Sequence, residues 1–360
     1  MTGERPFVDV IVVLWKSVPY LEALFDGLAS LDYPRDRMTL RIVDNGPGDG
    51  SLVEARRQMA RLAERLPEVV IHEPGTNLGF SGGNNLAIRE SIEAGRIFAY
   101  CLNSDASFEP GALREAVDVA EADAGVGSVQ SLLVLQQDPN EVNSEGNAIH
   151  FLGFGYCAGY HRKRSDVADE VKGIAYASGA GVLLRNSALK IVGLFDESLF
   201  MYHEDLDLGW RMMSAGYRNV LAPRSVVRHR YDFSRSISKW FFMERNRLLV
   251  VLKNYRFATL LVLAPQIVAL DIILFLFGVL GGWWKEKLRA TAWMFKPSTW
   301  VYLHRGRKDM ARIRRVPDRV ILGLMTPLIS YQEFESPFMR AVANPLMRLS
   351  FALVKLIVRW

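Results

Sequence analysis

The chain has 360 residues, of which 50% are hydrophobic and 23% charged, which is enough apolar sequence for a large core and excludes a disordered polymer. Its length predicts about two domains. The formal net charge of +5 favours anionic partners such as nucleotides, phospholipid headgroups or nucleic acid. With only Cys101 and Cys157 present, the sequence contains neither a disulfide framework nor a CxxC metal motif, and we expect a reducing compartment.

Strand and helix patterns alternate through the first 125 residues. The predicted strands are 8–15, 39–43, 68–72 and 97–102; the predicted helices are 18–31, 51–66 with Ser51 as N-cap, a helix that ends near 94 after the Gly-rich turn 77–85, and 110–122. Alternation at this spacing predicts a mainly parallel sheet with helices on both faces, an α/β fold of the Rossmann-like kind.

Polar side chains follow three of these strands at the point where each ends. They are Asp44, Asn77 and Asp105. Because ligands of such sheets bind outside the carboxyl ends of the strands, we expect these side chains to form one polar rim. Each residue alone also fits a plain turn or helix cap, which is the commoner role of Asp and Asn at such positions.

The next part of the chain is less regular, and no elements are assigned between 125 and 175. Beyond it we expect strands at 178–185 and 218–222 and helices at 204–215 and 236–254. Together with the preceding segments they predict a first domain over residues 1–255.

The composition changes after Lys253, and residues 256–360 are predicted to form a helical, membrane-associated region. Residues 257–284 are long and apolar enough to span a bilayer, and Trp283 and Trp284 with Lys285 suit an interfacial belt. Pro265 and Asp271 leave a kinked or surface-lying helix equally open, and a buried core helix is the third alternative.

Basic residues are concentrated in this C-terminal region. Residues 285–319 hold eleven Lys and Arg against three acids. In the last segment, 346–360, Arg348, Lys355 and Arg359 fall on one face of an otherwise apolar helix, which is typical of an interfacial anchor or of a terminal helix docked on the core.

The stretch FMYHEDLDLGWR, residues 200–211, carries the densest cluster of acids. Glu204, Asp205 and Asp207 occupy a helix start, where the helix dipole favours them, yet the surrounding residues are apolar. A carboxylate at such a site is suited to deprotonate a hydroxyl. At the sheet rim, Asp105 can offer an oxygen ligand to Mg²⁺ or Mn²⁺, and His229 can complete the metal's ligands.

As an ordered set, seven segments resemble the family 2 glycosyltransferases, which have the GT-A fold, and most closely the rhamnosyltransferase-like branch of bacterial surface polysaccharide synthesis. The segments are VIVVLW (10–15), VDNGPGDGS (43–51), NLGFSGGNN (77–85), LNSDASF (102–108), ASGAGVLLR (177–185), GLFDESLFMYHEDLDLGWRMMSAGY (193–217) and the stretch around His229. They cover roughly residues 7–255.

The resemblance implies roles for individual residues. The donor-binding residues would be Asp44, Asn77, Gly79, Asn84, Asn103 and Asp105, with Asp44 on the nucleobase; the metal ligands would be Asp105 and His229; Asp205 would be the catalytic base and Glu204 would orient the acceptor. Asn103 stands where the family has the first Asp of its D-x-D motif, so it would act indirectly or through water.

The implied reaction is an inverting transfer from a nucleotide-sugar, dTDP-rhamnose being the first expectation and a UDP-sugar the alternative. An acceptor carried on a polyprenyl diphosphate and a position on the cytoplasmic face of the bacterial plasma membrane follow from the apolar tail. Membrane lipid headgroups are expected partners and nucleic acid is not, because apolar segments flank the basic stretch.

Two other functional classes remain open from the sequence. A nucleotidyltransferase would need a Gly-rich loop beside Lys16, and none is there. A non-catalytic, membrane-associated scaffold that binds nucleotide-sugars is disfavoured because Asp105, Glu204, Asp205 and His229 are all present.

Overall fold

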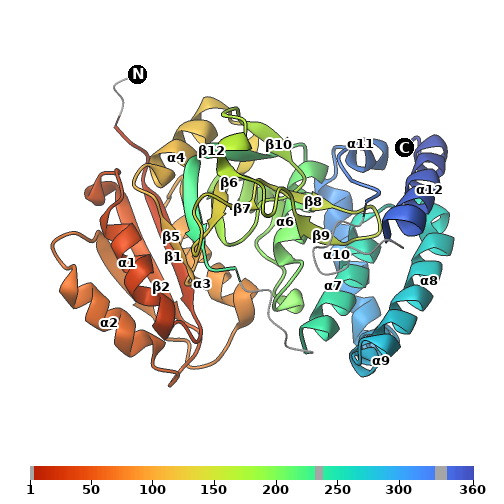
Figure 1. The fold of residues 1–360 in the computed structure, drawn as a ribbon, viewed down its shortest axis with the longest axis horizontal. Coiled ribbons are helices and arrows are strands. Elements are labelled where there is room, and N and C mark those ends of the chain that lie inside the picture. Colours follow the sequence, from red (N-terminus) through yellow and green to blue (C-terminus); the bar gives the residue numbers. More distant parts are fainter. Residues whose placement is uncertain (1–3, 232–237, 329–338) are drawn as a thin grey trace. The chain divides into compact units, whose positions relative to one another are not determined.

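The computed structural model describes residues 4–231, 239–328 and 341–360 in full and the backbone of 238, 339 and 340 (Figure 1). The chain divides into two compact units. Unit 1 comprises residues 1–147, 157–212 and 217–232, and unit 2 comprises 148–156, 213–216 and 233–360. The predicted boundary between residues 255 and 256, as a division between domains that fold separately, stays a prediction.

Unit 1 is built on a mixed, mainly parallel sheet whose strand order is β10-β12-β6-β11-β4-β1-β2-β3. The strands are β1 (Val8–Leu14), β2 (Met38–Asp44), β3 (Glu68–His72), β4 (Phe98–Asn103), β5 (Ala106–Phe108), β6 (Val126–Leu135), β7 (Val142–Ser144), β10 (Lys172–Ile174), β11 (Gly181–Arg185) and β12 (Arg218–His229). Strands β3, β2, β1 and β4 run parallel, whereas β11 is antiparallel to both of its neighbours. A separate small sheet pairs β8 (Asn147–Ile149) with β9 (Gly155–Cys157).

The α-helices of unit 1 follow the strands. They are α1 (Leu21–Ala29), α2 (Ser51–Arg61), α3 (Gly79–Glu93), α4 (Ala112–Ala122), α5 (Asn186–Val192) and α6 (Glu204–Ser214), with 3₁₀ turns at Val18–Tyr20, Arg35–Arg37, Arg164–Asp166 and Glu197–Leu199. The α/β architecture expected from the sequence is confirmed.

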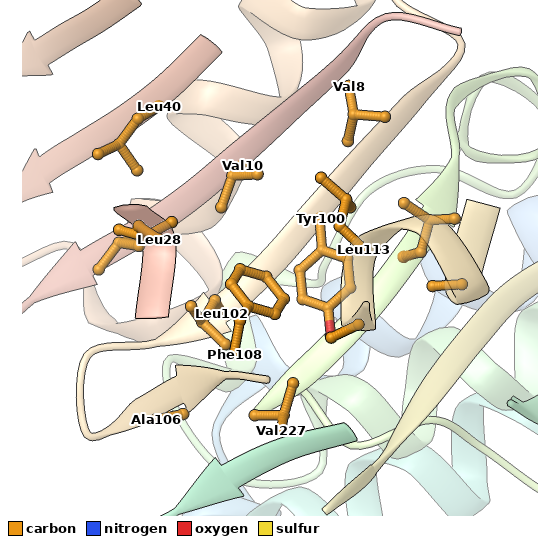
Figure 2. Close-up of a cluster of buried hydrophobic side chains, with 14 of the residues drawn as sticks. Val8, Val10, Leu28, Leu40, Tyr100, Leu102, Ala106, Phe108, Leu113 and Val227 are labelled. Carbon is orange, nitrogen blue, oxygen red and sulfur yellow. The ribbon is translucent and has the colours of Figure 1, made fainter. Parts of the chain in front are cut away.

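One face of the sheet packs against α1 and α4. Alternate residues of β1, among them Val8 and Val10, point to this face, where they meet Leu28 of α1 and Leu113 of α4 in one apolar cluster (Figure 2). Tyr100 of β4 lies in the same cluster with its ring 4.9 Å from that of Phe108. Burial of this kind contributes about 1.5–3 kcal/mol per large apolar side chain.

The other residues of β1 face α3, and here the packing is closer. A Cβ on Gly83 of α3 would lie 2.8 Å from Cγ1 of Val13, so the helix reaches the strand only because residue 83 has no side chain. On the same face the fully buried Asp9 accepts from Arg41, which also binds Glu90 of α3. Both faces of β1 are thus covered, which explains its nearly continuous apolar sequence.

Several local predictions were wrong in detail. Gly50, with φ of 86°, precedes the first residue of α2, and Ser51 is already helical and accepts a hydrogen bond from the Ser17 N–H. The helix α3 starts at Gly79, inside the expected Gly-rich turn. Strand β6 runs through a stretch left unassigned, and β12 extends to His229 because it pairs along its length with β6.

Unit 2 is helical. Its helices are α7 (Ser238–Asn254), α8 (Phe257–Leu280), α9 (Trp284–Trp293), α10 (Pro297–Ile313), α11 (Asp318–Gly323), a π-helical turn (Met339–Ala343) and α12 (Asn344–Ile357). By length and composition, α8 is the one helix among the described residues that could cross a membrane. Trp284 is exposed, as an interfacial belt requires, but Trp283 is buried and stacks on Trp240 at 4.8 Å.

Adding one methyl group at Gly83 tests the packing of α3 on β1. We expect Gly83→Ala to lower the free energy of unfolding by about 1–3 kcal/mol, because Val13 must shift and overpacking outweighs the better helix propensity of alanine. Urea unfolding of both proteins measures it. Gly173→Ala is the control, because its Cβ would meet no atom within 4 Å. Equal stability of the wild type and Gly83→Ala would contradict the close packing.

Candidate active site

Asp44 ends β2 beside Leu14, the last residue of β1. The side chain is buried, and its Oδ1 atom has no hydrogen-bond partner within the described part of the chain. Burial raises the pKa of Asp44, and a hydrogen bond from the backbone of Gly46 opposes that shift. A buried carboxylate oxygen without a donor suits a ligand that supplies an N–H group.

Asn45 connects this strand end to the predicted donor-binding loop. Its Nδ2 atom donates to Asn77 Oδ1 at 3.1 Å and to the carbonyl of Gly79 at 3.2 Å, and its Oδ1 accepts from the backbone N–H of Leu78 at 2.7 Å. The ends of β2 and β3 are thereby joined, so the structure brings Asp44 and Asn77 into one polar group.

Two further predicted donor-binding residues, Gly79 and Asn84, are enclosed by protein. Gly79 has a φ of 70°, and a Cβ there would lie 2.5 Å from the carbonyl oxygen of Phe200. Asn84 is buried in α3 and donates to the carbonyl of Phe80 at 3.0 Å. Their assignment to the donor stays a prediction.

Asp105 and His229 come together at the end of β12. Strand β5 folds back antiparallel to β12, which pairs Ala106 with His229, and the Arg230 N–H donates to the carbonyl of Asp105 at 2.9 Å. The result places His229 Nε2 3.4 Å from Asp105 Oδ1. Asn103 stands on the neighbouring strand β4, in register with Val13 of β1.

The arrangement of the His229 ring fits a cation. Nδ1 lies 2.8 Å from Asn143 Oδ1, which holds the ring so that Nε2 faces the Asp105 carboxylate. An imidazole nitrogen and a carboxylate oxygen that face each other are suited to bind one cation. The described residues contain no group of three or more His, Cys, Asp or Glu suited to a metal, so the remaining ligands would come from the substrate or water.

Two serines hold the turn that carries Asp105. Ser17 is fully buried, and its hydroxyl donates to Ser104 Oγ at 2.8 Å while accepting from the Trp15 N–H at 2.9 Å. The segment after β1 is therefore tied to the turn after β4. Trp15 itself is half exposed beside the end of β1.

Glu204 and Asp205 open α6, and in the described part of the chain neither carboxylate has a cationic partner. Glu204 is buried, and Oε2 has no hydrogen-bond partner among the residues that are described. Asp205 is half-buried and accepts from the Leu206 N–H at 2.7 Å. Burial raises the pKa of Asp205 to about 6, and burial followed by the charge of Asp205 raises the pKa of Glu204 well above its usual value. Such carboxylates are suited to proton transfer near neutral pH.

A single turn links this helix start to the sheet rim. In the turn that closes with a hydrogen bond from the Gly181 N–H to the Ser178 carbonyl, Gly179 directs its N–H at Asp205 Oδ2, 3.4 Å away. The next carbonyl, that of Ala180, accepts from the Asn103 N–H at 3.2 Å. The backbone of Gly179 and Ala180 therefore contacts both Asp205 and the end of β4, the strand that leads to Asp105.

The segment before α6 is strained. Phe200, Tyr202 and His203 all have φ between 66° and 68°, a region that bulky residues rarely adopt. Such strain costs of order 1–3 kcal/mol per residue and persists only where the surroundings enforce it, commonly at functional sites. Here Asn85 of α3 donates to the carbonyl of Phe195 at 2.8 Å and accepts from its N–H at 3.0 Å, which fixes the start of this segment.

The fold and this group of side chains agree with the comparisons. The model of a family described as "Glycosyltransferase like family 2" matches residues 5–248, and the chain belongs to this family. It is therefore a glycosyltransferase, and the expected GT-A fold is confirmed.

Two curated relatives illustrate the similarity. The N-acetylglucosaminyl-diphospho-decaprenol L-rhamnosyltransferase of Mycobacterium tuberculosis is 28% identical over 245 residues, which are 62% of this chain and 75% of that protein. The low-salt glycan biosynthesis hexosyltransferase Agl10 of Haloferax volcanii is 28% identical over 144 residues, 39% of this chain and 44% of the relative.

Among solved structures, the mannosyltransferase PcManGT of Pyrobaculum calidifontis, in complex with GDP-Man and Mn²⁺, superposes with a TM-score of 0.52. The match covers 99% of this chain and 89% of that one, at 17% identity. It shows a shared fold.

Sequence reasoning missed several residues that build the site. Asn45 adjoins Asp44 in a turn motif and could have been recognised as a side chain that organises the neighbouring loop. Ser17, Asn143 and Gly179 carry no such signal, because each acts through a contact with a residue more than twenty positions away.

The raised pKa of Asp205 predicts a pH-dependent stability difference. Between pH 4 and 6 the folded protein binds more protons at this group than the unfolded chain does, so ionisation of Asp205 costs stability as the pH rises through about 6. We expect Asp205→Asn to be more stable than the wild type by about 1–3 kcal/mol at pH 7, with the difference shrinking toward zero below pH 4.

Urea unfolding at pH 4, 5, 6 and 7 measures the stability difference between Asp205→Asn and the wild type. Glu109→Gln is the control, for which we expect a stability difference of the opposite sign. Burial acts to raise the pKa of Glu109, but Arg164 and Arg228 outweigh it and lower the pKa. The Gln variant should therefore lose stability at neutral pH. A wild-type protein as stable as Asp205→Asn at pH 7 would show that the Asp205 carboxylate is not held in an unfavourable environment.

Proposed function

We propose that the chain is an inverting, metal-dependent transferase that moves rhamnose from dTDP-rhamnose to a hydroxyl of a glycan acceptor carried on a polyprenyl diphosphate. The observation that carries this proposal is the pair of acids at the start of α6, which have no cationic partner among the described residues and are connected through one turn to the end of β4, the strand that leads to Asp105 and its contact with His229.

The donor nucleotide would bind along the carboxyl edge of the sheet. Asp44 would accept the imide N–H of the base, which satisfies its unpartnered Oδ1 atom. Asn77, already held by Asn45, would contact the nucleoside, and Gly79, Asn84 and Asn103 would complete the donor-binding set. Trp15 follows Leu14, the residue that pairs with Asp44, and its half-exposed ring would flank the base.

Asp105 and His229 would hold Mg²⁺ or Mn²⁺, with further ligands from the donor diphosphate. When bound, the ion supplies positive charge that stabilises the departing diphosphate. Asn143 fixes the ring of His229 so that Nε2 faces Asp105, and Ser17 fixes the turn that carries Asp105. Asn103 would act on the metal indirectly or through water.

In the chemical step, Asp205 would take the proton of the acceptor hydroxyl as its oxygen bonds to the anomeric carbon. The bond from that carbon to the diphosphate oxygen breaks on the opposite face, and the electron pair leaves with the nucleoside diphosphate. The pKa of about 6 keeps Asp205 ionised at neutral pH yet basic enough to accept the proton. Glu204, whose pKa burial and the charge of Asp205 raise, would orient the acceptor through a hydrogen bond.

The proposed acceptor and location rest on the relative from Mycobacterium tuberculosis, whose name describes rhamnosyl transfer to a decaprenyl-linked diphosphosugar, and on the apolar helix α8. A lipid-linked acceptor requires that the enzyme work at a membrane surface. The cytoplasmic face fits, because nucleotide-sugars are cytoplasmic metabolites. The alternative donor is a UDP-sugar such as UDP-glucose, UDP-galactose or UDP-N-acetylglucosamine.

Calorimetric titration with each of these donors, with and without Mg²⁺ or Mn²⁺, tests donor and metal together. We expect dTDP-rhamnose to bind only with metal, and Asp105→Ala to weaken binding at least tenfold because it removes one of two protein ligands. Preference for a UDP-sugar would move the function to the alternative donor. Metal-independent binding of equal affinity in the variant would contradict the metal site.

Substituting the proposed base separates chemistry from binding. Asp205→Asn should reduce kcat by at least a thousandfold while the affinity for the donor changes less than threefold, because a base acts only in the transition state. Glu93→Gln, at an exposed position at the end of α3, is the control and should retain donor binding and kcat. Parallel loss of donor binding in Asp205→Asn would show that Asp205 is a binding residue and not the base.

If the chain were a scaffold without catalytic function, metal-dependent donor binding would occur without turnover of any donor, including slow hydrolysis. The strained segment before α6 and the raised pKa of Asp205 favour the enzyme, because neither is required for binding alone.

A further inference from the structure

Unit 2 contains a buried cluster of four charged side chains, which we call the charge cluster: Glu244 and Arg247 of α7, Asp271 of α8 and Lys287 of α9. Arg247 Nη2 lies 2.6 Å from Asp271 Oδ1, and Lys287 Nζ lies 2.7 Å from Glu244 Oε2 and 2.9 Å from Asp271 Oδ1. The side chains of Arg247 and Lys287 are only 1% and 2% exposed. The cluster therefore joins three helices at their buried faces.

The charge cluster fixes the middle of α8. This helix has 24 residues, about 36 Å, and Asp271 is its fifteenth residue. Separating α8 from α7 and α9 would leave Arg247 and Lys287 buried without Asp271, and removing one partner from a buried ion pair is strongly destabilising. The sequence alone left Asp271 as an awkward residue in an apolar helix; its partners explain it.

The face of α8 turned away from the cluster is apolar along its whole length. We call it the outer stripe: Phe257, Leu261, Pro265, Val268, Ile272, Leu276 and Val279. These residues recur every three or four positions, so they share one side of the helix, and all seven are exposed. The opposite side holds the buried residues Thr259, Leu263, Leu270 and Gly278.

Helix α12 continues this exposed apolar surface. The indole N–H of Trp360 donates to Thr259 Oγ1 at 2.8 Å, which attaches the end of the chain to the start of α8 (Figure 1). Phe351, Val354 and Val358 bury one face of α12, while Leu346, Leu349, Leu353, Leu356 and Ile357 are all more than half exposed. Exposed apolar faces on two neighbouring helices are typical of a contact with a membrane or another protein.

We propose that unit 2 binds an anionic lipid bilayer through α8 and α12, with both helices lying in the plane of the interface, and that α8 does not cross the membrane. The proposal goes beyond the proposed function, and it rests on that function only in the expectation that the acceptor is at a membrane.

Charge decides between a bilayer and a protein partner. Arg348 and Lys355 of α12 are exposed on a side of the helix next to its apolar face, and Arg359 is exposed just beyond its end, where long basic side chains reach lipid phosphates. The exposed residues Lys285, Arg289 and Lys296 follow the end of α8. An apolar surface edged by cations is complementary to anionic headgroups.

The charge cluster argues for the in-plane arrangement. If α8 crossed the bilayer while its middle stayed attached to Arg247 and Lys287, α7 and α9 would have to enter the hydrocarbon with it. Helix α9 carries exposed Lys285 and Arg289, which cost several kcal/mol each at that depth. Lying flat, α8 places only its outer stripe in lipid and keeps the cluster buried in protein.

Vesicle sedimentation tests the surface with a matched pair of substitutions. Val268→Glu, within the outer stripe, should weaken binding of the full chain to vesicles of phosphatidylglycerol and phosphatidylcholine at least tenfold. Val53→Glu, at an exposed valine of α2 in unit 1, should leave it unchanged. The wild type should bind pure phosphatidylcholine less well. Equal binding by both variants, or no vesicle binding by a folded wild-type chain, would overturn the proposal.

Labelling from the two sides of a membrane tests the in-plane arrangement. Arg256→Cys and Lys285→Cys place a thiol at either end of α8, both at exposed positions. In sealed vesicles from expressing bacterial cells, a membrane-impermeant maleimide should label both sites in inside-out vesicles and neither in right-side-out ones, above the background from Cys157. Labelling of the two ends from opposite sides would show that α8 crosses, and would overturn the proposal.

Failure of the membrane proposal can be distinguished from failure of the proposed function. Metal-dependent donor binding by the wild type, measured by calorimetry in the absence of vesicles, concerns unit 1 alone. Donor binding without vesicle binding would remove the membrane proposal and leave the transferase intact, whereas vesicle binding without any donor binding would do the reverse.

Discussion

The candidate site depends on one piece of backbone pairing, the antiparallel contact of β5 with β12. This contact turns the chain back after β4, so that Asp105, at the end of one buried strand, lies against His229, at the end of another more than a hundred residues later. The Arg230 N–H to the Asp105 carbonyl closes the pair. Without it the two side chains would belong to separate strand ends, and the proposed pair of metal ligands would not be brought together.

Around that pairing, the site keeps several polar groups in unfavourable environments. Among the described residues, Asp44 and Glu204 each have a buried oxygen without a donor, and the half-buried Asp205 carboxylate has no cationic partner. Other buried acids of unit 1 form ion pairs: Asp9 with Arg41 and Asp207 with Arg211 are examples. At this edge of the sheet, a nucleotide, a metal and a hydroxyl would each supply a partner to one of the three acids.

In the charge cluster of unit 2, by contrast, the acidic and basic side chains pair with one another. Burial would raise the pKa of Glu244, yet Arg247 and Lys287 outweigh that effect and hold it at about 2, so Glu244 is ionised at neutral pH. The ion pairs of the cluster join three helices. Within the described residues, the proposed catalytic acids of unit 1 thus have no cationic partner, whereas the acids of the cluster in unit 2 are paired.

The alternating part of the fold could be predicted from the sequence because each strand there is a short apolar run that ends at a turn. Strands β1 to β4 are of this kind, and the rim formed by Asp44, Asn77 and Asp105 follows from their parallel order. Strand β6 could not be recognised in the same way, because it contains Ser128, Gln130 and Ser131, whose hydroxyl and amide groups are satisfied only by distant partners such as Asn219 and Tyr100.

The same limit applies to the site. The sequence indicated Asp105, Asp205 and His229 as candidates, and resemblance implied their roles, but the contacts that position them are long-range. Asn143 on His229 and Gly179 on Asp205 appear only once β7 and β11 have joined the sheet. The role of Asp271 in α8 likewise depends on its ion pairs with Arg247 and Lys287. These residues belong to other helices, so the local sequence pattern does not reveal the pairing.

The most direct test of the central claim is the position of the metal. Crystals grown with Mn²⁺ and a nucleoside diphosphate would give an anomalous peak at the manganese edge. We expect that peak within bonding distance of both an Asp105 carboxylate oxygen and His229 Nε2, with the diphosphate completing the ligands. A manganese ion bound elsewhere, or a nucleotide bound at this edge with neither residue in contact with a metal, would contradict the account.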